Sequence, residues 1–173
     1  FTAFTGMVDF GFNPSFTRNV TYIFSGAKNL RVNGIHSDVN DNEVDWNLLK
    51  NLISAMRWIY SRISVVLFVL LAVPGTLYIH FLIRDYAGNH ETVYLSWAIL
   101  VVTNAYSLYS QYYESLLMGK GMVKRSKQIM VYGQTLQLLI AALWLLNGGG
   151  LLAVVLAQSV SVIVIRLMYY SSF

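Results

Sequence analysis

The sequence contains no cysteine, which excludes a disulfide framework and thiolate metal sites. Charged residues are also scarce, at 12% of the 173 residues, whereas a soluble domain carries about a quarter. Hydrophobic residues make up 56% of the chain, and the mean hydropathy is +0.53. Because a backbone in lipid must satisfy its own hydrogen bonds, this composition predicts an all-α integral membrane protein.

The residue patterns of common enzyme sites are missing as well. We find no phosphate-binding glycine-rich loop, no catalytic carboxylate pair and no histidine-rich cluster. The polar segment 36–45 is similar to a calcium loop, but Glu43 replaces the turn glycine and Leu49 replaces the bidentate glutamate. The net charge of +4 does not indicate nucleic acid, because the basic residues flank apolar runs. We therefore expect no enzyme activity, no cofactor, no metal and no nucleic-acid partner.

Apolar runs of membrane-spanning length recur along the chain, given that a helix needs about 20 residues to cross a bilayer. We expect about five transmembrane helices, at residues 1–24, 63–83, 93–118, 129–146 and 151–167. The chain begins inside one apolar run, at Phe1, and ends soon after another, at Phe173. We therefore expect residues 1–173 to be a fragment of one transmembrane lobe.

The distribution of Lys and Arg predicts the orientation in the membrane. Basic residues gather at 28–62 and 120–127, whereas the connections at 84–91 and 147–150 hold almost none. By the positive-inside rule, the two basic segments are cytoplasmic. Arg166 then falls at the cytoplasmic end of the last span, where we expect its side chain to snorkel to the surface.

Residues 28–60 are expected to form a polar cytoplasmic loop followed by an amphipathic helix. Asp45 is a suitable N-cap for this helix, and apolar residues recur after it at helical spacing. Trp46 and Trp58 suit the headgroup layer. We expect the helix to lie on the inner membrane surface before the chain turns into the span at 63–83.

Arg18 is a cation inside the first apolar run, where a charge needs a wet cavity or a partner. Ser15 and Tyr22 share its helical face, and Pro14 is expected to kink the helix. Two interpretations remain open. Arg18 either lines a hydrophilic cavity and meets an anionic substrate, most simply a phosphate, or it pairs with a carboxylate on another helix and only fixes packing.

The third span carries a polar stripe with tyrosines beside it. The polar positions are Thr103, Ser107, Ser110, Gln111 and Glu114. Tyr106, Tyr109 and Tyr113 follow at the same helical spacing. Hydrogen-bonding groups next to aromatic planes suit a sugar, which has polar edges and apolar faces. The alternative is that Ser and Thr mediate helix packing while Tyr populates the interface.

Three stretches together resemble a known family. Asp9 to Phe12, with Pro14, Ser15 and Arg18 after it, resembles the second helix of Wzx-type polysaccharide flippases. These proteins belong to the polysaccharide-transporter branch of the multidrug/oligosaccharidyl-lipid/polysaccharide exporter superfamily. The segment 112–121 is similar to the end of the family's fourth helix, and 74–78 is similar to its third.

The resemblance implies a six-helix N-terminal lobe that works with a second lobe of the same polypeptide in a bacterial inner membrane. It implies flipping of an undecaprenyl-diphosphate-linked oligosaccharide to the outer leaflet by alternating access. On this interpretation the substrate contacts are Arg18, Asn13 and Tyr22 for the diphosphate, and Ser110, Gln111, Tyr113 and Glu114 for the sugars.

Two other functions remain open. One is a drug or metabolite exporter of the same fold coupled to protons or sodium, with Asp9 or Glu114 as the ion-carrying carboxylate. The other is a membrane-embedded assembly or scaffold protein, in which the polar stripes only hold helices together.

Overall fold

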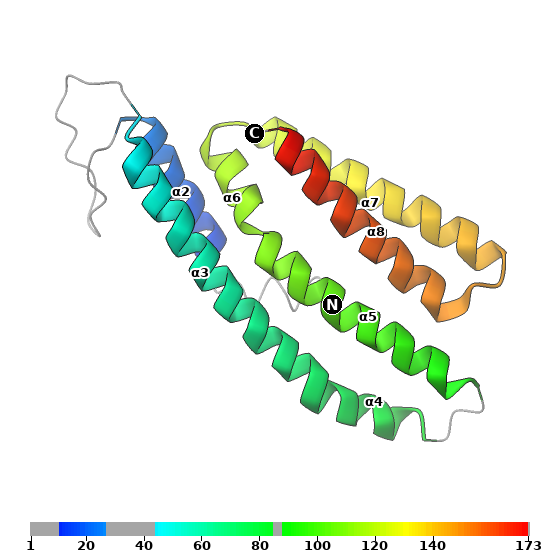
Figure 1. Ribbon diagram of the computed structural model, residues 1–173. Helices are drawn as coiled ribbons and strands as arrows, with labels where there is room; N and C mark the ends of the chain where they lie inside the picture. Colours follow the sequence, from blue (N-terminus) through cyan, green and yellow to red (C-terminus); the bar gives the residue numbers. More distant parts are fainter. Residues whose placement is uncertain (1–10, 27–43, 85–87, 173) are drawn as a thin grey trace.

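The computed structural model describes residues 11–26, 44–84 and 88–172, and its described part contains helices and no strand. The elements are α2 (Phe12–Phe24), α3 (Trp46–Leu70), the π-helical segment η1 (Leu71–Gly75), α4 (Thr76–Leu82), α5 (His90–Ser110), α6 (Tyr112–Gly119), α7 (Val123–Leu146) and α8 (Gly150–Ser171). The long helices run side by side along one direction, with α5 between α3 and α8 (Figure 1). The expected all-α class is confirmed.

Three helices in the described ranges are long and apolar enough to cross a membrane. They are Trp46–Leu82, Val123–Leu146 and Gly150–Ser171. These helices contain the expected spans at 129–146 and 151–167 and all but the last residue of the span at 63–83. The spans expected at 1–24 and 93–118 are not in this set, and residues 1–10 lie outside the described residues, so crossing by those two segments stays a prediction.

The position of α5 in the bundle accounts for its polar side chains. Its polar side chains Ser96, Thr103 and Asn104 are buried in the bundle. Helices α3 and α8 pack against it from two sides. Polar groups sheltered in this way face protein and not lipid, so they lower the hydropathy of the helix without preventing its burial.

Helix α3 differs from the surface helix expected from the sequence. Asp45 caps it as predicted, because its carboxylate accepts hydrogen bonds from the backbone N–H groups of Asn47 and Leu48, both at 2.9 Å. The helix does not turn before the apolar run. It continues through η1 and α4 as Trp46–Leu82, 37 residues or about 55 Å long. The polar first part is therefore continuous with the apolar run and is not a separate helix joined to it by a turn.

The two prolines affect their helices differently. Pro14 is the third residue of α2, where a missing N–H costs no hydrogen bond, and helix Phe12–Phe24 continues past it. Pro74 lies deep in the long helix, and the five-residue π-helical segment η1 forms around it. A local widening of this kind accommodates a proline without ending the helix.

Small and hydroxylated residues hold the helices close together. Examples are the bonds of Ser64 Oγ to Ala105 O (2.6 Å), Thr103 Oγ1 with Ser159 Oγ (2.7 Å) and Ser161 Oγ to Gly133 O (2.8 Å). A Cβ atom on Gly133 would overlap the side chain of Ile165. Close backbone approach with hydroxyl bonds across it is the usual way in which helices associate in lipid.

Helix α2 is held against α3 and α6 by an aromatic and aliphatic cluster. Its buried members are Phe16, Val20, Met56, Tyr60, Tyr112 and Leu116. Gly119 allows the close contact, since a Cβ on it would overlap Val20 and lie 2.9 Å from the carbonyl oxygen of Thr17. Ser115 Oγ also donates to Asn13 Oδ1 at 2.7 Å.

The basic residues gather at one end of the bundle. The start of α3, the α6–α7 connection and the end of α8 lie there, whereas Arg84 and the α7–α8 turn lie at the other end (Figure 1). The positive-inside rule predicts that this basic end is cytoplasmic.

Cysteine labelling tests the orientation at two exposed positions. In intact cells, an impermeant thiol reagent should modify Asn147→Cys, at the α7–α8 turn, and should leave Lys124→Cys unmodified until the membrane is permeabilised. The parent chain has no cysteine, so it supplies the unlabelled control. Labelling of Lys124→Cys from outside would reverse the topology.

Candidate functional site

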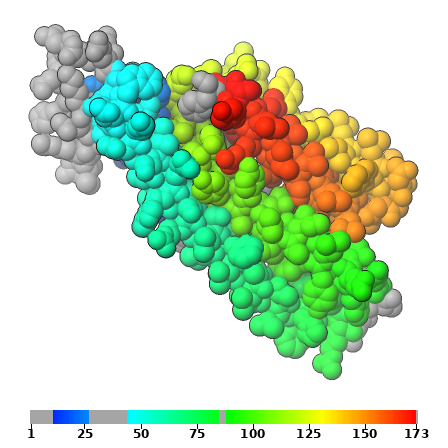
Figure 2. Space-filling model, in the orientation of Figure 1, coloured from blue at the N-terminus to red at the C-terminus, as the bar shows by residue number. Residues whose placement is uncertain are grey.

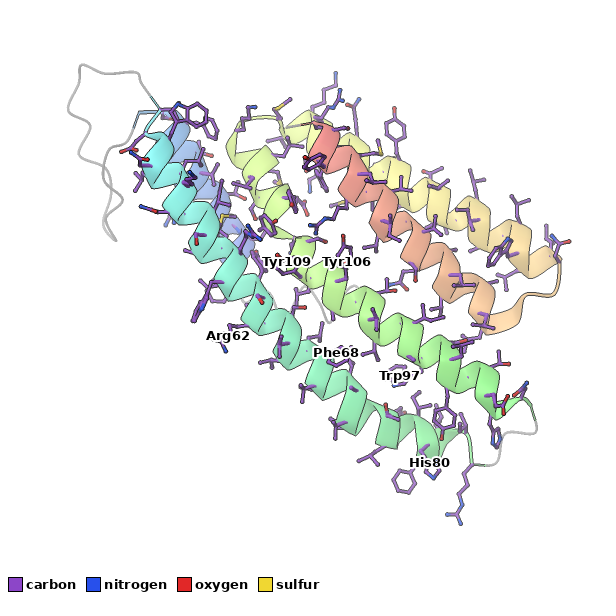
Figure 3. All side chains as sticks on the ribbon, in the orientation of Figure 1. Arg62, Phe68, His80, Trp97, Tyr106 and Tyr109 are labelled. Carbon is purple, nitrogen blue, oxygen red and sulfur yellow. The ribbon has the colours of Figure 1, made fainter. Side chains whose placement is uncertain are left out.

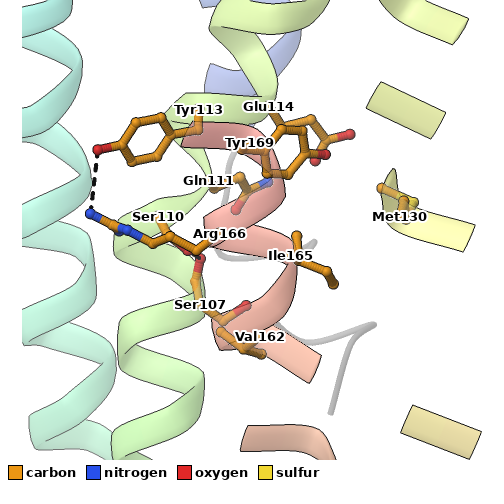
Figure 4. A pocket seen from close by; sticks show the side chains of 10 residues that line it. All are labelled: Ser107, Ser110, Gln111, Tyr113, Glu114, Met130, Val162, Ile165, Arg166 and Tyr169. Atoms are coloured by element: carbon orange, nitrogen blue, oxygen red, sulfur yellow. Dashed lines mark hydrogen bonds between the residues drawn. The ribbon is translucent and has the colours of Figure 1, made fainter. Parts of the chain in front are cut away.

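A polar cavity of about 270 Å³ lies where α5, α6, α7 and α8 meet (Figure 4). Its lining residues are Ser107, Ser110, Gln111, Tyr113, Glu114, Met130, Val162, Ile165, Arg166 and Tyr169. Most of the polar groups come from the α5–α6 region, and α8 supplies a cation in the middle of an apolar face. We call this space the Arg166 cavity.

A local tightening of the chain separates α5 from α6 and shapes one wall. The backbone N–H of Gln111 donates to Leu108 O at 3.2 Å, and the N–H of Glu114 donates to Gln111 O at 3.0 Å. These bonds span three residues, as in a 3₁₀ turn. The turn lies among Ser107, Ser110, Gln111 and Glu114, all of which line the cavity.

Arg166 on α8 reaches the tyrosines of α5 and α6. Its Nη2 donates to the Tyr113 hydroxyl oxygen at 3.3 Å (Figure 4). The guanidinium carbon lies 4.7 Å from the centre of the Tyr113 ring, 5.1 Å from that of Tyr106 and 5.9 Å from that of Tyr109. Cation–π attraction to these three rings holds the side chain against α5 and α6.

One donor of this guanidinium is left over. Nη1 of Arg166 is buried and has no hydrogen-bond partner among the described residues. A buried polar group without a partner is costly and unusual, and more so when it carries charge. Arg binds phosphate and carboxylate through donors of this kind, and an anion in the cavity reaches Nη1 only if the Arg166 side chain shifts to uncover this buried atom.

The carboxylate that lines the cavity already has a partner. Glu114 Oε1 lies 3.2 Å from Lys127 Nζ, and the Glu114 side chain is 16% exposed against 51% for Lys127. Glu114 therefore faces the half-exposed Lys127 on α7, at the edge of the cavity. With this pair mutually compensated, Arg166 leaves the cavity with a net positive charge.

The cavity lies near the basic end of the bundle. Helix α8 has 22 residues, which makes it about 33 Å long, and Arg166 is five residues before its last residue, Ser171. The guanidinium therefore belongs to the cytoplasmic side of the predicted membrane, within one and a half turns of the helix end.

The structure brings together four of the residues predicted from sequence. Ser110, Gln111, Tyr113 and Glu114 all line the Arg166 cavity. Thr103, from the same stripe, instead bonds to Ser159 on α8, which is a packing role. The stripe thus divides between packing in the middle of the bundle and a cavity near its basic end.

The other predicted residues lie elsewhere. Arg18 is exposed on α2 and forms neither a hydrogen bond nor an ion pair with another described residue, so neither interpretation of it is supported by the described contacts. Asn13 bonds to Ser115 and Thr17, and Tyr22 is half-buried on α2. None of the three lines the Arg166 cavity. Asp9 lies outside the described residues.

Arg166 is the site residue that the sequence analysis misplaced. We expected it to snorkel to the surface, but its side chain is turned inward among the tyrosines. The available signal was that Arg166 is the one charged residue in the span at 151–167. An intramembrane cation marks a site by default, and the same argument that selected Arg18 applies to Arg166.

Comparison of the chain with protein-family models, with curated proteins and with solved structures gives no match.

Proposed function

We propose that this chain is part of a membrane transporter whose Arg166 cavity receives the anionic headgroup of a lipid-linked substrate. The observation that carries the proposal is the buried, unpartnered Nη1 of Arg166 in a cavity lined by polar side chains. A cation placed this way attracts an anion, and the hydroxyls, amide and tyrosine rings around it suit the sugar that follows a phosphate.

The location of the cavity supports the same proposal. A lipid-linked substrate assembled in the cytoplasm presents its headgroup at the inner leaflet, which is the depth we assign to Arg166. The resemblance to Wzx-type flippases then suggests the substrate, an undecaprenyl-diphosphate-linked oligosaccharide flipped across a bacterial inner membrane. Under this proposal Arg166, in place of Arg18, is the cation that meets the diphosphate.

A flipping assay of the complete protein tests the proposal. Vesicles carry a fluorescent polyprenyl-diphosphate oligosaccharide, and an impermeant quencher reports how much of the label is exposed at the outer surface. Protein-containing vesicles should exchange the label between leaflets, and protein-free vesicles should not. Exchange that is no faster with the protein than without it would overturn the proposal.

Glu114→Gln separates this function from an ion-coupled exporter. Because Glu114 already faces Lys127, we expect the amide to keep most of the transport, with at most a severalfold change from the lost ion pair. If Glu114 carries a proton or sodium ion instead, the variant should lose every response to an imposed gradient. The measurement is transport by both forms with and without a gradient, and loss of the gradient response alone would favour the exporter.

The scaffold interpretation draws on a different part of the structure. Bonds such as Thr103 with Ser159 and Ser161 with Gly133 explain the polar residues in the middle of the bundle as packing. They do not account for a guanidinium with a free, buried donor, because a packing residue gains stability by having its donors satisfied. The proposal for a transporter rests on this difference.

A further inference from the structure

A second polar hollow lies along α3 and is closed on one side by Tyr109 of α5. It has a volume of about 670 Å³ and is lined by Lys50, Ile53, Ser54, Arg57, Trp58, Ser61, Arg62, Val65 and Tyr109. Three of these residues are cations and none is acidic. We call this hollow the α3 groove.

The cations of the α3 groove are exposed and arranged along the helix. Lys50, Arg57 and Arg62 are all exposed, and the serines between them, Ser54 and Ser61, are exposed as well. The Arg62 guanidinium lies 5.4 Å from the centre of the Trp58 ring. Arg62 points away from the neighbouring helices (Figure 3), and in the space-filling view α3 forms one edge of the molecule (Figure 2).

The depth of the groove places it at the inner membrane surface. Arg62 directly precedes the uncharged run from Ile63 to Ile83, which is long enough to cross the hydrocarbon layer. Arg57 lies five residues, about 8 Å, further toward the cytoplasm, in the headgroup layer. Trp58 is 62% exposed at the same level, where tryptophan is favoured.

The groove and the cavity are separate sites with one shared wall. Tyr109 lines the groove, and its ring also lies 5.9 Å from the Arg166 guanidinium. All other lining residues of the groove belong to α3, whereas the cavity lies among α5, α6, α7 and α8. The cations of the groove are exposed, so a molecule bound there would lie at the surface of the described helices and not inside the Arg166 cavity.

We infer that the α3 groove binds the headgroup of an anionic phospholipid of the inner leaflet. The inference rests on charge complementarity. Three cations and two serine hydroxyls lie at the level of the headgroup layer, where the anion is lipid phosphate. The planar guanidinium of Arg62 suits a lipid phosphate. The Trp58 ring and Val65 beside it suit the acyl chain of the same lipid. The inference is independent of the proposed transport function.

Native mass spectrometry of the full chain tests the inference. The protein is released from vesicles of equimolar phosphatidylglycerol and phosphatidylcholine, and the lipids that remain bound are counted. The parent chain should retain phosphatidylglycerol in preference. Arg57→Gln/Arg62→Gln should lower this preference by roughly 30-fold, since each cation near the surface is worth about a factor of five in binding anionic lipid. Arg57→Lys/Arg62→Lys should keep most of it.

The matched control removes the same charge elsewhere on the cytoplasmic side. Lys124→Gln/Arg125→Gln changes two exposed cations outside the groove and should leave the preference unchanged. If this control lost as much of the preference for phosphatidylglycerol, the preference would depend on general surface charge, and the assignment of the groove as a lipid site would be wrong. Displacement of the lipid by inorganic diphosphate would assign the groove to free phosphate. If the parent chain is a dimer and only the Arg57→Gln/Arg62→Gln variant is a monomer, the groove binds a second copy of the chain and not a lipid.

Discussion

Replacing Arg166 with glutamine is expected to weaken binding of a polyprenyl-diphosphate lipid by roughly a hundredfold, or about 3 kcal/mol. The substitution removes the cation that the three tyrosine rings hold in the cavity, together with its free Nη1 donor. Glutamine keeps a polar side chain at the same place, so the loss of binding measures the effect of removing the positive charge. Binding can be measured by titrating the labelled lipid into the protein reconstituted in nanodiscs.

Two further variants separate charge at the site from charge in general. Arg166→Lys should recover part of the binding, because lysine supplies the positive charge without the planar fork of donors. Lys124→Gln removes an exposed cation outside the cavity and should bind as the parent does. Unchanged binding by a correctly inserted Arg166→Gln protein would contradict the assignment.

Tyr60→Ala is expected to have the largest effect on stability, about 3 kcal/mol or more. Tyr60 is completely buried, and its ring lies 5.9 Å from that of Phe16 in the cluster that joins α2, α3 and α6. Removing the ring leaves a cavity at the point where three helices meet. The expected result is a lower thermal unfolding midpoint in detergent and reduced accumulation in the membrane.

The matched control for this substitution is Tyr132→Ala. Tyr132 lies on α7 and is 59% exposed, so its loss should change the midpoint little. Similar midpoints for the two variants would mean that the cluster around Tyr60 does not hold α2 in place.

Helical periodicity was enough to find one wall of the candidate site. The spacing of Ser107, Ser110 and Glu114 places them on one side of the chain at the α5–α6 junction, and the structure collects them with Tyr113 around a single cavity. A pattern of this kind is local, because residues three and four apart share a helical face whatever surrounds the helix.

Local sequence patterns could not show which of the two intramembrane cations, Arg18 or Arg166, lies in the cavity. Arg18 and Arg166 both interrupt apolar runs, and nothing in either run says which helix will lie opposite. The answer depends on α8 packing against α5 so that Arg166 meets Tyr106 and Tyr113. These residues are about 50 to 60 positions away in the sequence, so only the tertiary fold brings them together.

The boundary of α3 shows a second limit of sequence patterns. The change from polar to apolar at Arg62 and Ile63 was interpreted as a turn between two helices, but helix Trp46–Leu82 continues through it. Such a change records where the chain enters hydrocarbon. Backbone direction depends on whether the local residues can stay helical, and no glycine or proline occurs between Trp46 and Val73 to interrupt them.

The most direct test of the Arg166 cavity is an experimental structure of the protein with a polyprenyl-diphosphate oligosaccharide bound. The account predicts phosphate oxygens within hydrogen-bond distance of Arg166 Nη1, with the Tyr113 hydroxyl still bonded to Nη2 and the first sugar near Ser110 and Gln111. A diphosphate bound at Arg18, or a carboxylate filling the place beside Nη1, would contradict it.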